Sequence, residues 1–103
     1  MKAPAPIEVP VGIPGRKCRV LVGPHLLART GELARDSGLG GTCAVITDEN
    51  VGPLHGAAVR NSLEAAGIRA VLLTVPAGER SKCLATAEDV CDRMIEAGLD
   101  RGS

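Results

Sequence analysis

The chain contains no phenylalanine, tyrosine or tryptophan among its 103 residues. Aromatic rings supply much of the buried area in most cores and also the platforms on which nucleic-acid bases stack. The core must therefore be built from aliphatic side chains, and nucleic-acid binding by base stacking is excluded. At this length folding buries only about 60–70% of the surface of the unfolded chain. A modest core without rings suggests that the chain is part of a larger protein.

An excess of charge of either sign is also lacking. The 12 basic residues balance the 12 acidic ones, and no block of like charge stands out. This balance argues against electrostatic binding to nucleic acid or to a membrane surface. No apolar run approaches the roughly 20 residues of a membrane span, and no hydrophobic segment follows Lys2 to form a signal peptide. We therefore expect a cytoplasmic protein with neither nucleic-acid nor membrane partners.

Metal-ligand spacing is missing as well. No C-x-x-C pair occurs among the four cysteines, which are Cys18, Cys43, Cys83 and Cys91. Reduced and mostly buried thiols are expected instead of a zinc site. His25 and His55 have no cysteine or second histidine at ligand spacing, so both are expected to be exposed polar residues. The sequence thus predicts no metal site in this chain, and no pairing of a nucleophile with a base is visible.

What the sequence does contain is a regular alternation of strand and helix patterns. The predicted strands cover residues 7–11, 17–22, 43–47 and 69–75, and the predicted helices cover residues 25–37, 54–66 and a long segment between Ser81 and Gly98. Such alternation with short turns predicts a parallel sheet with right-handed crossovers. The predicted fold class is α/β, a Rossmann-like and mostly parallel sheet with flanking helices.

Several details of these elements can be predicted. Pro10 suggests that the first strand lies at a sheet edge, and residues 12–16 indicate a connection longer than a tight hairpin turn. The continuous apolar run at 43–47 is typical of a strand buried on both faces. Gly31 is expected to weaken its helix by about 1 kcal/mol relative to alanine. The buried stripe of the last helix is predicted to consist of Leu84, Ala87, Cys91, Met94 and Ile95.

Two polar segments follow the last two predicted strands directly. They read T-D-E-N-V-G-P-L at residues 47–54 and P-A-G-E-R-S-K at residues 76–82. The carboxyl ends of parallel strands lie side by side, at the edge where open α/β sheets bind ligands. We therefore expect Asp48, Asn50, Glu79 and Lys82 to face one crevice. A carboxylate there can accept hydrogen bonds from ribose hydroxyls, and a lysine can reach a phosphate.

The same residues also allow a purely structural interpretation. Asp48 and Ser81 can cap helices, Glu79 can be an acid favoured by a helix dipole, and Lys82 can be solvated. Spacing alone favours this second interpretation, because caps are commoner than ligands at such positions. The glycine-rich residues 38–41 give no further help, since they precede a strand, whereas a dinucleotide fingerprint follows one.

Taken together, the motifs resemble the 3-dehydroquinate synthase family. The resemblance is carried by the strand pair that ends in V-L-V-G, L-L at the start of the first helix, T-D-E-N-V-G-P-L and P-A-G-E-R-S-K. It implies conversion of 3-deoxy-D-arabino-heptulosonate 7-phosphate to 3-dehydroquinate and phosphate in the shikimate pathway. It also implies NAD as a transient oxidant, with a divalent metal, zinc or cobalt, that polarises the reacting hydroxyl. In this resemblance Asp48, Asn50, Glu79 and Lys82 contact NAD, and none of the chain's residues is catalytic.

The resemblance also has gaps. The glycine-rich G-G-G-x-x-G-D loop of the family does not occur in the chain, and His25 lies where many members have glycine. The implied organisation is that residues 1–103 form the N-terminal part of the NAD-binding domain. A C-terminal helical domain with the metal ligands would lie outside the chain, and the full-length enzyme would be a homodimer. The alternatives are a related sugar-phosphate cyclase, a metal-dependent alcohol dehydrogenase, or a standalone α/β module that binds another ligand in the same crevice.

Overall fold

The computed structural model describes residues 5–103, which form an antiparallel hairpin followed by an α/β unit. The strands are β1 (Ile7–Ile13), β2 (Arg16–Val22), β3 (Thr42–Asp48) and β4 (Arg69–Val75), and the helices are α1 (Thr30–Asp36), α2 (Ala57–Ala65) and α3 (Leu84–Glu96). Three short helical turns are η1 (Leu27–Arg29), η2 (Gly52–Gly56) and η3 (Glu79–Ser81). None of the described helices combines the length and apolarity needed to cross a membrane.

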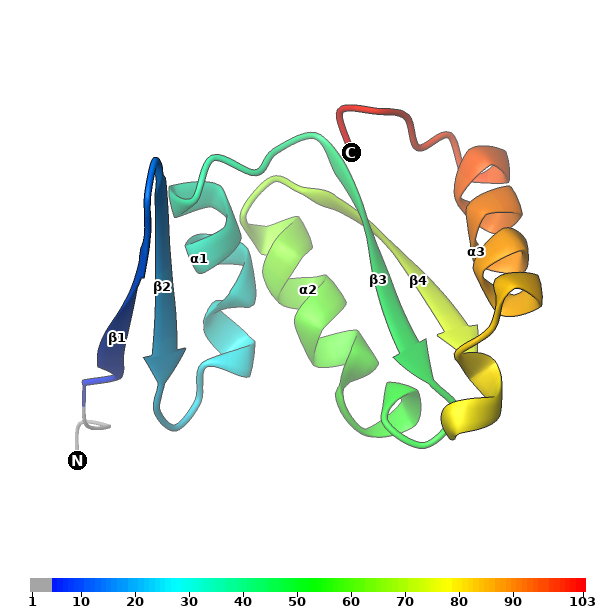
Figure 1. Ribbon diagram of the computed structural model, residues 1–103, viewed down its shortest axis with the longest axis horizontal. Helices are drawn as coiled ribbons and strands as arrows, with labels where there is room; N and C mark the ends of the chain where they lie inside the picture. Colours follow the sequence, from blue (N-terminus) through cyan, green and yellow to red (C-terminus); the bar gives the residue numbers. More distant parts are fainter. Residues whose placement is uncertain (1–4) are drawn as a thin grey trace.

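The α/β unit has three layers. β3 and β4 pair in parallel, with α2 on one face and α3 on the other, and α1 packs against the outer side of α2 (Figure 1). Val45 of β3 packs against the cluster of buried residues that includes Leu63 of α2. Ile46, which alternates to the opposite face, lines a hollow with Val75 and with Val90 of α3. The predicted α/β class, a parallel sheet with flanking helices, is therefore confirmed.

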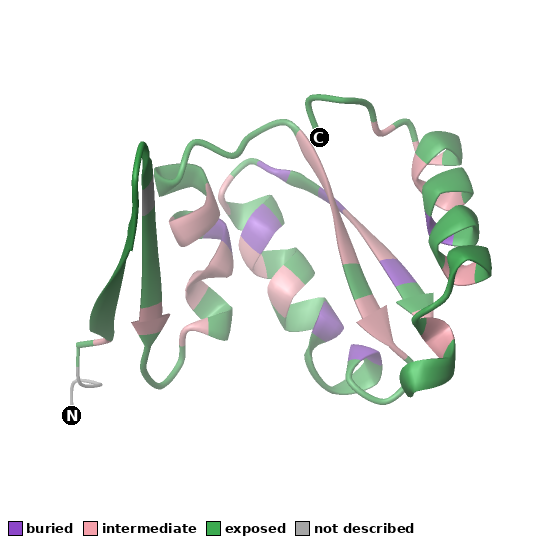
Figure 2. Ribbon diagram, viewed as in Figure 1, coloured by how far each residue is buried: buried purple, intermediate pink, exposed green. Residues whose placement is uncertain are grey.

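The core is small and aliphatic. Its main cluster of buried residues consists of Leu63, Ile68 and Ala70, with partly buried neighbours on α1, β3 and α2. Of the five buried hydrophobic residues among those described, three lie on β4 or directly before it, one on α2 and one on α3 (Figure 2). The expectation that residues 43–47 are buried on both faces is wrong, because Ile46 is 53% exposed. On the same face, Leu73 of β4 is only 6% exposed. The face that carries α3 is thus well covered over β4 and open at Ile46 of β3.

The hairpin is tighter than predicted. β1 and β2 pair as far as Ile13 and Arg16, which leaves only Pro14 and Gly15 in the turn. Gly15 has φ +74°, and the proline ring holds its own φ near about −65°. These are the φ values of a type II turn, which needs glycine at its second central position. The predicted edge position of Pro10 is confirmed, since β1 pairs only with β2 among the described residues.

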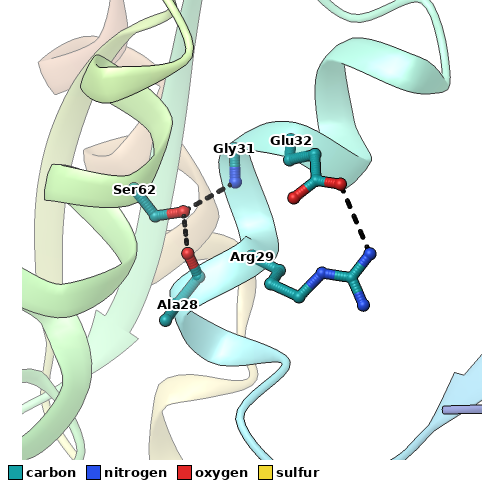
Figure 3. A network of polar contacts seen from close by, with 5 residues as sticks. All are labelled: Ala28, Arg29, Gly31, Glu32 and Ser62. Carbon is teal, nitrogen blue, oxygen red and sulfur yellow. Dashed lines mark hydrogen bonds and ion pairs between the residues drawn. The ribbon is translucent and has the colours of Figure 1, made fainter. Parts of the chain in front are cut away.

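The first helix is shorter than predicted, because residues 25–37 are divided between η1 and α1. His25 has a left-handed backbone with φ +61°, which keeps it out of the helix. The Gly31 N–H donates to Ser62 Oγ over 2.9 Å, and the Ser62 hydroxyl donates to the Ala28 carbonyl over 2.8 Å (Figure 3). A Cβ on Gly31 would overlap the Ser62 carbonyl oxygen and lie 2.9 Å from Leu63 Cα. Glycine is therefore required where α1 meets α2.

The predicted buried stripe of α3 is largely wrong. Leu84 is 88% exposed and Ile95 70% exposed, and Ala87 and Cys91 are exposed as well. The residues that face inward instead are Thr86, Val90, Arg93, Met94 and Ala97. Arg93 fixes this orientation, because its guanidinium donates to the Thr74 carbonyl of β4 over 2.8 Å. Its Nε lies 3.2 Å from Asp89 Oδ2, in an ion pair without hydrogen-bond geometry.

The cysteines also differ from the expectation of mostly buried thiols. All four are free, and only Cys43 is partly buried. The other three, Cys18, Cys83 and Cys91, are exposed. The reason lies in their surroundings: Cys18 belongs to the exposed hairpin, Cys83 lies at the start of α3, and Cys91 lines the hollow between α3 and Ile46 of β3.

Candidate functional site

The two polar segments leave the sheet at the same edge. Asp48 and Val75 form the last register pair of β3 and β4, and the Glu49 N–H donates to the Val75 carbonyl over 3.1 Å. Glu79 follows Val75 by four residues, in η3. The parallel register thus brings the segments 47–54 and 76–82 side by side at the carboxyl edge, where such sheets bind ligands.

Asp48 shapes the first segment. Its Oδ1 accepts hydrogen bonds from the backbone N–H groups of Asn50 and Val51, over 2.9 and 2.7 Å. This is the turn that an aspartate forms with its own backbone before a helix. Among the described residues no hydrogen bond to Oδ2 is seen, so that oxygen can accept a bond from a ligand. The capping and binding interpretations of Asp48 are therefore compatible.

Two glycines bring the following turn onto the end of the sheet. Gly52 and Gly56 are both buried in η2. A Cβ on Gly52 would lie 3.0 Å from Thr47 Cγ2, and one on Gly56 would lie 3.1 Å from Leu72 Cδ2. Side chains at these positions would push η2 away from β3 and β4. The glycine in T-D-E-N-V-G-P-L thus lets the backbone of η2 pack closely on the threonine side chains at the ends of β3 and β4.

Glu49 joins the two segments, a role that the sequence analysis missed. Its Oε1 accepts a hydrogen bond from the Ala77 N–H over 3.3 Å. Its position directly after β3 was the available signal, but only the parallel register shows that Ala77 lies opposite. Gly78 then adopts φ +100°, a conformation that favours glycine. The side chain of Glu49 therefore helps to set the path of the second segment.

The capping role considered for Ser81 is wrong. Its hydroxyl donates to the Pro76 carbonyl, which closes the turn between β4 and η3. α3 begins only at Leu84, with Cys83 as its N-cap residue. Cys83 Sγ lies 3.3 Å from Thr86 Oγ1. Hydrogen bonds from the Thr86 side chain and from the first backbone N–H groups of α3 lower the pKa of the Cys83 thiol.

Glu79 and Lys82 form the exposed rim of the edge. Lys82 Nζ lies 3.0 Å from Glu79 Oε1, and the two side chains are 76% and 85% exposed. An ion pair this exposed contributes only about 0–1 kcal/mol to stability, so a ligand can separate it at little cost. Asn50 is also exposed, with a side chain that can both donate and accept.

The described residues contain no group of three or more histidines, cysteines, aspartates or glutamates placed to share a metal ion. The site at the carboxyl edge therefore consists of carboxylates, an amide and an ammonium group. Acceptors of this kind suit the hydroxyls of a sugar ring, and the ammonium group suits a phosphate.

Comparison with known proteins gives a consistent result. No protein-family model matches the chain. The 3-dehydroquinate synthase of Mesorhizobium japonicum is 39% identical over 99% of the chain and 27% of its own length. Those of Rhizobium etli and Citrifermentans bemidjiense are 40% and 41% identical over 96% and 93% of the chain, and 26% of their own lengths. Nearly the whole chain is therefore similar in sequence to about a quarter of a 3-dehydroquinate synthase, which confirms the resemblance found in its motifs.

Proposed function

We propose that the chain is the N-terminal NAD-binding segment of a 3-dehydroquinate synthase. The enzyme would convert 3-deoxy-D-arabino-heptulosonate 7-phosphate to 3-dehydroquinate with loss of phosphate. The observation that carries this proposal is the 39–41% identity to enzymes of that name along nearly the whole chain. Since the chain spans about a quarter of those relatives, the helical domain that binds zinc or cobalt is proposed to lie in the remainder.

The residues of the carboxyl edge fit one part of NAD. The unbonded Oδ2 of Asp48 and the carboxylate of Glu79 can accept hydrogen bonds from ribose hydroxyls, which are strengthened by the negative charge. Lys82, released from Glu79, can bind a phosphate oxygen, and Asn50 can orient the sugar with its amide. When bound, NAD supplies a hydride acceptor that is regenerated within each turnover. The contribution of this chain is to bind and orient the cofactor.

A segment exchange tests the proposal. The matching quarter of the Mesorhizobium japonicum enzyme is replaced by this chain, and phosphate release from the heptulosonate phosphate is measured with NAD and zinc present. We expect turnover from the chimera and loss of NAD affinity when Glu79 and Lys82 are both changed to alanine. The same exchange with the Rhizobium etli segment controls for the effect of exchange itself. A folded chimera that neither binds NAD nor releases phosphate, beside an active control, would contradict the proposal.

A further inference from the structure

The two edges of the parallel sheet are not equivalent. The Val75 carbonyl of β4 accepts a hydrogen bond from the Glu49 N–H, so this carbonyl points toward β3. Because the backbone groups of successive residues in a strand point in opposite directions, the Thr74 carbonyl points to the outer edge of β4. Arg93 of α3 donates to that carbonyl over 2.8 Å. A side chain of α3 therefore occupies the outer edge of β4 near its carboxyl end.

The outer edge of β3 is open. Since the Glu49 N–H points toward β4, the same alternation directs the backbone groups of Ala44 and Ile46 away from β4. Among the described residues, no side chain forms a hydrogen bond with the backbone of residues 42–47. This stretch contains no charged residue and no proline, which are devices by which proteins protect an exposed sheet edge. The outer edge of β3 can therefore accept another strand.

An apolar surface flanks this open edge. Ile46 of β3 is 53% exposed and lines a hollow together with Ala87 and Cys91 of α3. Leu84 and Ile95 lie on the same side of α3 as Cys91, because residues four, seven and eleven positions apart share one side of a helix. Both of these side chains are exposed. A strand placed beside β3 would cover Ile46 and this side of α3 with its own apolar side chains.

The path of the chain predicts which edge the next strand takes. α2 connects β3 to β4 across one face of the sheet, and α3 lies on the opposite face (Figure 1). Crossovers between parallel strands are right-handed in nearly all proteins. With its helix on the opposite face, a right-handed crossover from β4 leads back across the sheet, past β3. The Arg69 guanidinium, at the first residue of β4, donates to the Ala97 carbonyl over 3.1 Å, so α3 ends at the amino end of the sheet. From there a strand can run parallel to β3.

We propose that the outer edge of β3 and the apolar side of α3 are the contact surface for a parallel strand that follows α3 in a longer protein. The sheet then continues beyond β3 and not beyond β4. The relatives provide the length for such a strand, since this chain covers only about a quarter of them. A strand tethered to α3 reaches the edge through a short connection, whereas a second copy of the chain would lose translational and rotational freedom on binding.

This arrangement would also define the position of the candidate site within the sheet. The crossovers on the two faces would diverge from β3, so that Asp48, at its carboxyl end, lies at the point where open α/β sheets bind ligands. The inference rests on the proposed continuation of the chain but not on the proposed reaction. Its tests therefore involve neither NAD nor turnover, and their failure is distinguishable from failure of the proposed function.

The first test compares the 103-residue chain with a version extended at its C-terminus. The extension is the roughly 20 residues that follow the matching quarter of the Mesorhizobium japonicum enzyme, enough for a loop and a strand. Hydrogen exchange of single backbone amides is measured by NMR. Ala44 and Ile46 should exchange about tenfold more slowly in the extended chain, relative to Leu72, because pairing protects their N–H groups. Leu72 is the matched control, since its N–H points to the outer edge of β4 by the same alternation.

The other outcomes of this comparison contradict the proposal. Slower exchange at Leu72, without a change at Ala44 and Ile46, would place the new strand beside β4. An extension that slows none of the three amides would show that no strand pairs with either edge. Protection of Ala44 and Ile46 in the 103-residue chain itself, rising with its concentration, would assign the edge to a second copy.

The second test introduces a charge beneath the proposed strand. Ile46→Lys places an ammonium group at a site that is half exposed in this chain but would be covered in the extended chain, where an unpaired charge is costly. The melting temperature of the extended chain should fall by roughly 5–10 °C, and that of the 103-residue chain much less. Leu39→Lys, in a loop and 61% exposed, is the matched control and should change neither. Equal effects of Ile46→Lys on the two chains would overturn the proposal.

Discussion

At the scale of single residues, Asp48 serves the fold and, in our proposal, the cofactor with different oxygens. Oδ1 holds the backbone of Asn50 and Val51, while Oδ2 is available for a ribose hydroxyl. The first role needs only an acceptor, which asparagine also provides. The second depends on negative charge, which strengthens the bond to a hydroxyl and repels the 2′-phosphate of NADP. Substitutions can therefore separate the two roles.

We predict that Asp48→Asn leaves the stability of the chain nearly unchanged, whereas Asp48→Ala lowers it by about 1 kcal/mol through loss of the cap. In the chimeric enzyme, Asp48→Asn should weaken NAD binding several-fold and reduce the preference for NAD over NADP. Urea denaturation measures stability, and calorimetry with each cofactor measures affinity. Unchanged cofactor selectivity in the Asp48→Asn chimera would show that this carboxylate does not face the ribose.

Two cysteines are predicted to differ in reactivity. The pKa of Cys83 is lowered, chiefly by the hydrogen bond from the Thr86 hydroxyl, and the pKa of Cys43 is raised by burial. The thiolate is the nucleophile, so as pH rises Cys83 should reach its maximal alkylation rate before Cys43 does. Peptide mapping after brief iodoacetamide treatment at several pH values measures both rates.

The substitution Thr86→Val tests the cause of the lowered pKa. It keeps the shape of Thr86 but removes its hydroxyl, and should shift the pH profile of Cys83 alkylation to higher pH. A profile that does not move would rule out this cause.

At the scale of elements, the contact between α1 and α2 depends on Gly31, which from the sequence alone was expected only to weaken its helix. We predict that Gly31→Ala destabilises the chain by about 1–3 kcal/mol, because the added methyl group forces the two helices apart. Gly40→Ala is the matched control, since nothing lies within 4 Å of a Cβ there. Thermal unfolding of both variants provides the measurement. Equal melting temperatures would mean that α1 and α2 separate without cost.

The elements also show what local patterns can and cannot predict. β4 was predicted with the bounds that it has, because R-A-V-L-L-T-V lies between clear breaking residues. The orientation of α3 was not predicted, because apolar residues lie on two of its sides and the choice rests on the Arg93 bond to Thr74. A bond between residues 19 positions apart leaves no periodic signal. The tight turn at Pro14 and Gly15 was missed because glycine is typical of turns, whereas Gly12 belongs to β1 and pairs with Lys17 of β2.

For the candidate site, the positions of its residues along the chain could be predicted from the sequence, but the contacts between them could not. Strand-to-helix junctions indicated where Asp48, Asn50, Glu79 and Lys82 lie, since parallel strands present their carboxyl ends together. The contacts within the site were not predictable, because the Glu49 bond to Ala77 spans 28 positions. The role of Ser81 was also hidden, since a serine before a helix resembles a cap whether or not it bonds elsewhere.

At the scale of the whole molecule, the chain carries exposed apolar surface at both ends of its layered structure. The hairpin exposes one side at one end, and Leu84 and Ile95 of α3 are exposed at the other. Between them lies a core with only five buried hydrophobic residues among those described. A core this small gives a marginal free energy of unfolding. Association through either surface would therefore contribute to stability as well as to assembly.

The proposed division of the NAD site between this chain and the rest of the enzyme leads to a last prediction. If this chain supplies one side of the NAD site, and the metal ligands and a pyrophosphate-binding loop lie in the other three quarters of the enzyme, binding and catalysis need both parts. The 103-residue chain alone, mixed with zinc, NAD and the heptulosonate phosphate, should release no phosphate above background and should bind NAD weakly. The chimera at equal concentration is the positive control. Because differential binding of the transition state requires all interacting groups at once, turnover by the isolated chain would refute this division, even if the family assignment held.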